Sequence, residues 1–250
     1  MLASWNWRHS PLQLMGSGTV DAVFFDISSV IEYCCVYFEN NEDAITVIDN
    51  CHENDVKMVV SEGLRSSLND CISDRNRLYE RLVMKAEEHM RNEEMSATDY
   101  RDNVLCESFI TEVIDGNLNQ HYLSDIEELR EEFNTRGLKE FKNYINDVRI
   151  QANQLRFQFE TVSDLETCER ASDPPWHVKA SIDEKSDSDM QTQCFLDYGY
   201  WRRRNYGPLM IGSLCAAAEY QDKITSILSN LSNDNPSVLT PTQLIEMSES

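Results

Sequence analysis

Short apolar runs rich in β-branched and aromatic residues alternate with longer helical patterns, and this alternation constrains the fold most. Val20 to Phe25 forms the first run and VKMVV (56–60) the second. PLMIGSL (208–214) contains the third, and Val238-Leu239 is the last. Strands that alternate with helices favour a parallel sheet covered by helices. We therefore predict an α/β fold, a three-layer α/β/α sandwich with a mainly parallel central sheet.

Capping residues indicate where several of the intervening helices begin. Ser61 precedes the helix that follows the second run. Thr240 caps the last helix, with Pro241 at its first position. Two further helices are predicted over 30–38 and 41–53.

Composition changes along the chain. Residues 74–165 are charged and amphipathic, which predicts two to four helices and no strand. Residues 166–186 contain Asp173-Pro174-Pro175 and many Ser, Asp and Glu residues, so we predict a loop or linker there. Residues 1–19 are predicted to form an irregular N-terminal arm.

The net charge of -22, from 44 acidic and 22 basic residues, excludes a protein that coats nucleic acid through its overall charge. The sequence has no apolar run of membrane-spanning length and no pattern of a signal peptide. Its eight cysteines form no CxxC motif, and buried free thiols are the simplest interpretation. We therefore expect a cytoplasmic protein.

Acidic residues occur where a parallel sheet would place them at one edge. Asp26 directly follows the first run, and Glu62 lies two residues after the second. Asp187 and Asp189 begin the helix that precedes the third. Ligands of open α/β sheets bind at the carboxyl ends of the strands, and clustered carboxylates suit Mg²⁺ or Mn²⁺. Taken singly, each acid also fits a helix cap, a first-turn acid or a linker residue.

Four segments together resemble a PIN-like domain, a family of metal-dependent ribonucleases and related nucleases. They are VFFDISSVI (23–31), VVSEGLRSSL (59–68), SDSDMQTQCFLDYG (186–199), and PLMIGSL (208–214) followed by SVLTPTQLIEM (237–247). They cover about half of the chain, at its two ends. The resemblance implies an α/β/α sandwich with an acidic pocket that binds Mg²⁺ or Mn²⁺.

The resemblance also implies roles for single residues. Asp26 would be a metal ligand, Glu62 the second acid, and Asp187 or Asp189 the third. A fourth acid commonly follows the penultimate strand of the family, but Ile211-Gly212-Ser213-Leu214 contains none. Ser213 is a candidate to hold a water molecule there. This departure leaves open a PIN-like protein with a reduced or inactive site.

By the same resemblance, the chain divides into four parts. They are an N-terminal arm (1–19), the first part of a PIN-like domain (20–73), a helical insertion (74–165) and the second part of the domain (166–250). The insertion could clamp a nucleic acid, bind a protein partner or form a homodimer.

Basic and aromatic side chains are concentrated in the segment from Tyr200 to Arg204. Tyr200, Trp201, Arg202, Arg203 and Arg204 could contact phosphates and stack on unpaired bases. They follow the third-acid helix and could therefore border the pocket. The alternative is a contact with a partner protein or with acids of the same chain.

These features predict a metal-dependent nuclease, most simply an endoribonuclease that acts on RNA or single-stranded nucleic acid. The chain contains no P-loop, no GxGxxG and no Gly-x-Ser-x-Gly motif, which argues against the corresponding nucleotide-binding and hydrolase classes. The alternative is a PIN-like binding module that has lost catalysis.

Overall fold

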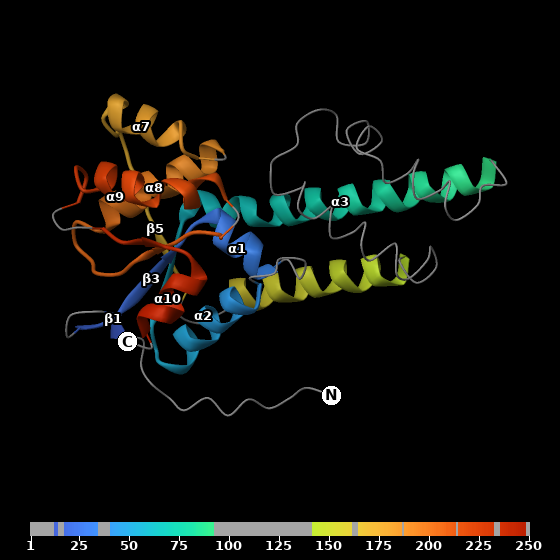
Figure 1. Cartoon of the computed structure of the whole chain (residues 1–250), viewed down its shortest axis with the longest axis horizontal. Coiled ribbons are helices and arrows are strands. Elements are labelled where there is room, and N and C mark those ends of the chain that lie inside the picture. The colour runs from blue at the N-terminus through green and yellow to red at the C-terminus, as the bar shows by residue number, and fades with distance from the viewer. Residues whose placement is uncertain are drawn as a thin grey trace.

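A five-stranded parallel sheet forms the centre of the computed structural model, which describes residues 13–14, 18–34, 41–92, 142–161, 165–186, 188–213, 215–232 and 236–248 (Figure 1). Its strands are β3 (Ala22–Phe25), β4 (Lys57–Ser61), β5 (Leu165–Cys168), β6 (Leu209–Met210) and β7 (Val238–Leu239), in the spatial order β5-β4-β3-β6-β7. A separate antiparallel pair joins β1 (Gln13–Leu14) to β2 (Gly18–Thr19). The predicted α/β fold with a parallel sheet is confirmed.

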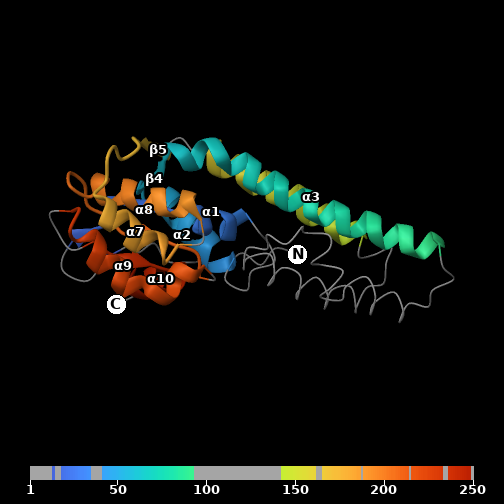
Figure 2. The ribbon, with the colours of Figure 1, turned by 90° about the horizontal axis from the view of Figure 1, so that it is seen from above.

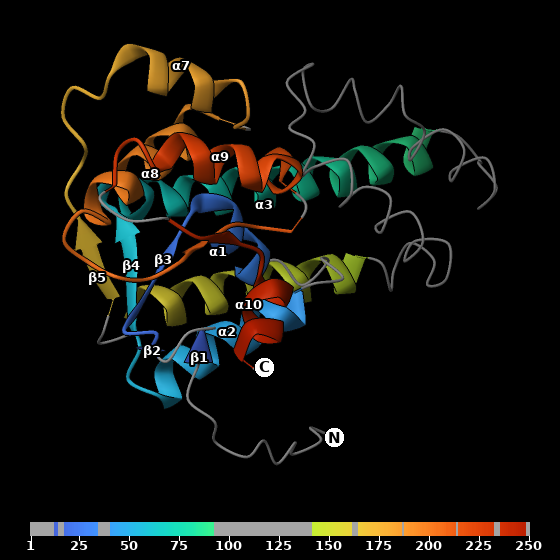
Figure 3. The ribbon, with the colours of Figure 1, turned by 60° about the vertical axis from the view of Figure 1, so that its left-hand side comes forward.

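Helices cover both faces of this sheet (Figure 3). They are α1 (Ile27–Cys34), α2 (Asn41–Glu53), α3 (Glu62–Asn92), a helix over 142–161, α7 (Trp176–Asp183), α8 (Asp189–Trp201), α9 (Gln221–Leu228) and α10 (Pro241–Ser248), with a 3-10 turn η1 (Ala216–Tyr220) before α9. Val23 and Phe25 pack with α1, α2 and the start of α3, whereas Phe24 packs with α7, α8 and α9. Alternate residues of one buried strand thus supply two separate cores.

The strand order places β3 at the point where the chain changes direction across the sheet. The chain moves outward from β3 to β4 and β5, and then returns to add β6 and β7 on the other side of β3. Such a switch point opens a crevice at the carboxyl ends of the two diverging strands, where α/β proteins bind ligands. Here those strands are β3 and β6, joined beyond their ends by the Asp26 amide, which donates to the Met210 carbonyl at 3.1 Å.

Several local predictions are confirmed. Helix α2 has the predicted bounds, and Ser61 caps α3 through a 3.1 Å hydrogen bond from the Leu64 amide to its hydroxyl. Helix α10 begins at Pro241, as predicted. The first predicted helix is displaced: α1 begins at Ile27, because Asp26 itself caps it by accepting a hydrogen bond from the Ser29 amide.

Two predictions in the second half are wrong. Residues 74–165 were expected to contain no strand and 166–186 to form a loop, but β5 and α7 lie in this region. Strand β5 is an edge strand with polar, half-exposed residues, and it exists by pairing with β4. Helix α7 buries only Val178 and Ile182, so its composition resembles that of a linker.

The long helix α3 and the helix over 142–161 run side by side and project from the sheet (Figures 1 and 2). We call residues 74–92 and 142–161 the helical arm. Ion pairs Lys142–Glu87 and Arg149–Glu80 join its two helices. These helices agree with the helical composition predicted for 74–165, of which 93–141 lies outside the described residues. None of the described helices is long and apolar enough to cross a membrane.

Candidate acidic site at the switch point

Asp26 is the innermost acid of the switch point, with an exposed fraction of 0%. One carboxylate oxygen, Oδ1, accepts hydrogen bonds from the Ser29 amide at 2.9 Å and the Ser28 hydroxyl at 2.8 Å. The other, Oδ2, is 2.7 Å from the Ser28 hydroxyl and accepts from the Gln191 side-chain amide at 2.8 Å. All of these donors are neutral, so they do not cancel the charge of the carboxylate.

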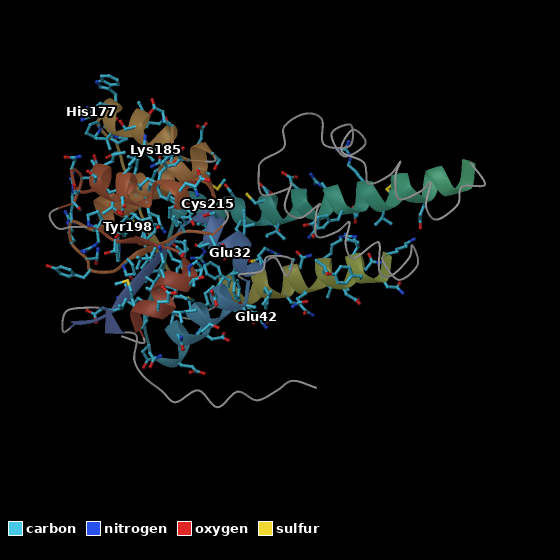
Figure 4. The ribbon with its side chains drawn as sticks, viewed as in Figure 1. Glu32, Glu42, His177, Lys185, Tyr198 and Cys215 are labelled. Atoms are coloured by element: carbon cyan, nitrogen blue, oxygen red, sulfur yellow. The ribbon has the colours of Figure 1, made fainter. Side chains whose placement is uncertain are left out.

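Glu32, on the next turn of α1, is a second buried acid at the same place. Its Oε2 accepts from the Ser213 amide at 2.5 Å, and its Oε1 accepts from the Ser213 hydroxyl at 3.1 Å. Figure 4 shows Glu32 beside the base of the helical arm. Sequence analysis missed Glu32, although it is the one charged residue in α1.

The turn after β6 connects the two acids. The Gly212 amide donates to the Ser28 hydroxyl at 2.8 Å, and the same hydroxyl contacts Asp26. A Cβ at position 212 would lie 2.9 Å from the Ser28 carbonyl oxygen and 3.0 Å from Glu32 Oε2, so only glycine lets the turn approach this closely. Ser213 therefore holds Glu32, whereas a water-holding role was predicted for it.

Burial raises the pKa of both acids. For Asp26, burial outweighs the hydrogen bonds from Gln191, Ser29 and Ser28, which lower the pKa. For Glu32, burial and the charges of Asp26 and Asp43 raise the pKa to about 7, against the hydrogen bonds from Ser213. Perturbed carboxyl groups of this kind concentrate at functional sites.

Glu32 predicts a pH dependence of stability. Its pKa is about 7 in the folded protein against an ordinary value of 4.5, so the folded state binds this proton more tightly than the unfolded chain. The contribution of Glu32 to stability is therefore fully present below the unfolded pKa and is lost as the pH rises from about 4.5 to about 7, by up to on the order of 3 kcal/mol. We expect Glu32→Gln to remove this part of the decrease, measured by urea unfolding between pH 4.5 and pH 8.

The exposed Glu42 of the neighbouring helix α2 offers a matched control. Glu42→Gln is expected to keep the wild-type decrease. Equal pH slopes for the wild type and Glu32→Gln would contradict the assignment.

The other predicted acids lie around this centre, in different settings. Glu62 follows β4, which pairs with β3, so Asp26 and Glu62 leave the sheet at the same edge, but Glu62 is exposed. Asp189 is exposed in the first turn of α8, the turn that also carries Gln191. Asp187 lies outside the described residues. Within the described part of the chain, no three Asp, Glu, His or Cys side chains are placed to share one metal ion.

Asp197 is a further buried acid that sequence analysis missed. Its Oδ1 accepts from the Ala171 amide and from the Gln193 side chain, both at 2.7 Å. Burial raises its pKa, the bonds from Ala171 and Gln193 and the charge of Arg170 lower it, and the charge of Glu62 raises it further. This acid anchors the segment after β5 to α8.

The basic and aromatic cluster lies at the opposite end of α8 from the turn that contacts Asp26, and its predicted place at the border of the site stays a prediction. Its first two residues, Tyr200 and Trp201, end α8, about 15 Å along the helix from Gln191, which contacts Asp26. Arg202 Nη1 donates to the Asn205 carbonyl at 2.8 Å, and Arg203 Nε donates to the Leu231 carbonyl at 2.6 Å.

The rings of this cluster are engaged within the fold as well. Trp201 packs against Phe24 with ring centroids 5.6 Å apart, and Arg203 lies 4.2 Å over the Tyr200 ring. These contacts lie within the chain but go to backbone carbonyls and rings, whereas the predicted alternative was a contact with acids or a partner protein. Arg204 is exposed, and nucleic-acid binding by this cluster stays a prediction.

No protein-family model, curated protein or solved structure matches this chain. The donor set suits a hard divalent cation, because two buried carboxylates and two hydroxyls offer only oxygen ligands. Asp26 Oδ2 already accepts a hydrogen bond from the Gln191 side-chain amide, so a cation at this oxygen would have to displace that amide.

Proposed function

We propose that this protein is a PIN-like, metal-dependent nuclease that hydrolyses phosphodiesters in RNA with Mg²⁺ or Mn²⁺. The observation that carries the proposal is the burial of Asp26 and Glu32 at the switch point of a parallel sheet, with neutral donors around Asp26. Two buried carboxylates repel each other, and a bound divalent cation would relieve that repulsion.

Different residues of the chain would bind the cation and contact the substrate. Asp26 and Glu32 would hold the cation, with Ser28 and Ser213 orienting their carboxylates. Glu62 and Asp189 are exposed at the start of α3 and α8, where they can reach a substrate at the rim. A divalent cation would stabilise negative charge on the phosphodiester. It would also lower the pKa of a bound water molecule, so that hydroxide is available as a nucleophile at neutral pH.

The net charge of -22 also supports dependence on a cation. An acidic surface repels the phosphate backbone, and a divalent ion at the switch point would convert that local repulsion into attraction. Substrate binding should accordingly require the metal and should improve when moderate salt screens the repulsion.

The test measures cleavage of end-labelled single-stranded RNA by the full chain with Mn²⁺ or Mg²⁺. We expect Asp26→Asn and Glu32→Gln each to lower the rate by at least about 100-fold, since even outer partners of metal ligands are worth 10–100-fold. Glu62→Gln should lower the cleavage rate less, because Glu62 is exposed and is not buried with Asp26 and Glu32. Asp183→Asn, which changes an exposed acid at the end of α7, is the control and should leave the rate unchanged.

Wild-type rates for the Asp26→Asn and Glu32→Gln variants would refute the assignment of these acids. Absence of cleavage by the wild type with both metals would refute the nuclease function.

A second candidate is a PIN-like binding module without catalysis, and a specific observation favours it. The Gln191 amide fills the position on Asp26 Oδ2 that a cation would take. The helical arm exposes Met84, Ile150 and Phe157, apolar side chains that suit a protein partner or a second copy of the chain. This candidate predicts no rise in melting temperature with Mn²⁺, whereas a nuclease that binds the metal should show one.

A further inference from the structure

Gln191 closes the acidic site from the side of α8. It is fully buried, and its backbone amide donates to the Ser188 hydroxyl at 3.2 Å, which caps the helix. Its side-chain amide donates to Asp26 Oδ2 at 2.8 Å and lies 3.2 Å from the Ser28 hydroxyl. One side chain thus contacts both the central acid and the hydroxyl that links Asp26 to the turn after β6.

The amide hydrogens bring partial positive charge to a carboxylate oxygen at the position where a cation would bind. The Ser29 amide donates to the other oxygen, Oδ1, and the Ser28 hydroxyl lies within hydrogen-bond distance of both oxygens. A cation that binds Asp26 through Oδ2 must therefore displace the amide and break its hydrogen bonds to Asp26 and Ser28. The cost of that displacement is subtracted from the binding free energy of the metal.

We infer that Gln191 is the internal competitor for the cation and sets the metal affinity of the site. The inference rests on the proposed function, because it concerns the same cation. A tightly held resident metal is not expected. The site should load only at high divalent concentration or when a substrate phosphate contributes further ligands.

Two substitutions separate the roles of the amide. Gln191→Glu replaces the amide by a carboxylate of the same shape, which repels Asp26 without metal and adds a ligand with it. Gln191→Ala removes the competitor and adds no ligand. Gln193→Glu is the matched control, because Gln193 lies on the same helix and its amide also donates to a buried acid, Asp197.

The experiment titrates the full chain with Mn²⁺ and follows two readouts, the melting temperature and the free Mn²⁺ signal in electron paramagnetic resonance. We expect Gln191→Glu to lower the Mn²⁺ concentration at half-saturation by roughly 10-fold or more. Its melting temperature without metal should fall below that of the wild type and should recover with Mn²⁺. Gln191→Ala should bind more tightly than the wild type by a smaller factor.

Gln193→Glu should keep the wild-type half-saturation. Gln191→Ala keeps the test decisive if Gln191→Glu does not fold. Binding by the position-191 variants no tighter than wild type, or an equal gain in Gln193→Glu, would overturn the inference.

The outcomes also separate this inference from the proposed function. Tight Mn²⁺ binding by Gln191→Glu, together with a wild type that neither binds Mn²⁺ nor cleaves RNA, would support Gln191 as competitor and refute the nuclease. A wild type that cleaves RNA, with equal Mn²⁺ affinity in all variants, would support the nuclease and refute the role of Gln191.

Discussion

Replacing Phe159 with alanine is expected to lower the free energy of unfolding by about 3–5 kcal/mol, the range for large aromatic side chains removed from a core. Phe159 ends the helical arm inside the domain, with 1% of its side chain exposed. Its ring lies 5.9 Å from that of Phe25 and 6.0 Å from that of Tyr33. The substitution should leave a cavity between the arm, the central strand and α1. Urea unfolding followed by circular dichroism measures the loss.

The same helix provides the control for this prediction. Phe157 lies two residues earlier, with 62% of its side chain exposed. Phe157→Ala should therefore change stability by only about 0.5 kcal/mol. A loss for Phe157→Ala as large as that for Phe159→Ala would mean that the arm does not anchor in the core as described.

The central strands could be predicted from the sequence, because their residues have high β-propensity and are also the residues that fill the core. Val23, Phe24 and Phe25 are β-formers, and each also fills a core on one face of the sheet. Strand β5 lacks this agreement. It has Glu166 and Thr167 in its middle, and it depends on pairing with β4, beside which the exposed Lys57–Glu166 ion pair adds little. No local sequence pattern predicts a strand that forms only by pairing with a distant segment.

The candidate site divides in the same way. Asp26 could be placed at the sheet edge from the sequence, because it directly follows the last residue of a buried strand. Glu32 could have been found, since an acid within an apolar helix must have a buried partner or a function. Gln191 could not, because nothing local distinguishes an amide that donates to an acid 165 residues away. Arg202 follows the helix that carries Gln191 but lies at its other end, so proximity in sequence alone does not bring it to Asp26.

Gly207→Ala is expected to be among the most destabilising substitutions in the domain, although it adds a single methyl group. A Cβ at position 207 would lie 2.1 Å from the carbonyl oxygen of Ala22 and 2.9 Å from its carbonyl carbon. These are backbone atoms of the central strand, so no side chain can rotate away. The loss should reach or exceed the upper end of the about 1–3 kcal/mol range for overpacked sites. Thermal and urea unfolding would measure it.

Gly63→Ala is the control, because a Cβ there meets no atom within 4 Å. Gly63 lies in α3, where alanine should stabilise the helix by up to about 1 kcal/mol. Gly207 adjoins β6, so a displaced chain there would shift β6 against β3 and separate Ser213 from Glu32. The Ser213 hydrogen bonds lower the pKa of Glu32, so their loss in Gly207→Ala should raise that pKa further and increase the pH dependence attributed to Glu32. Wild-type stability and pH dependence in this variant would show that β3 and β6 do not approach as closely as the register requires.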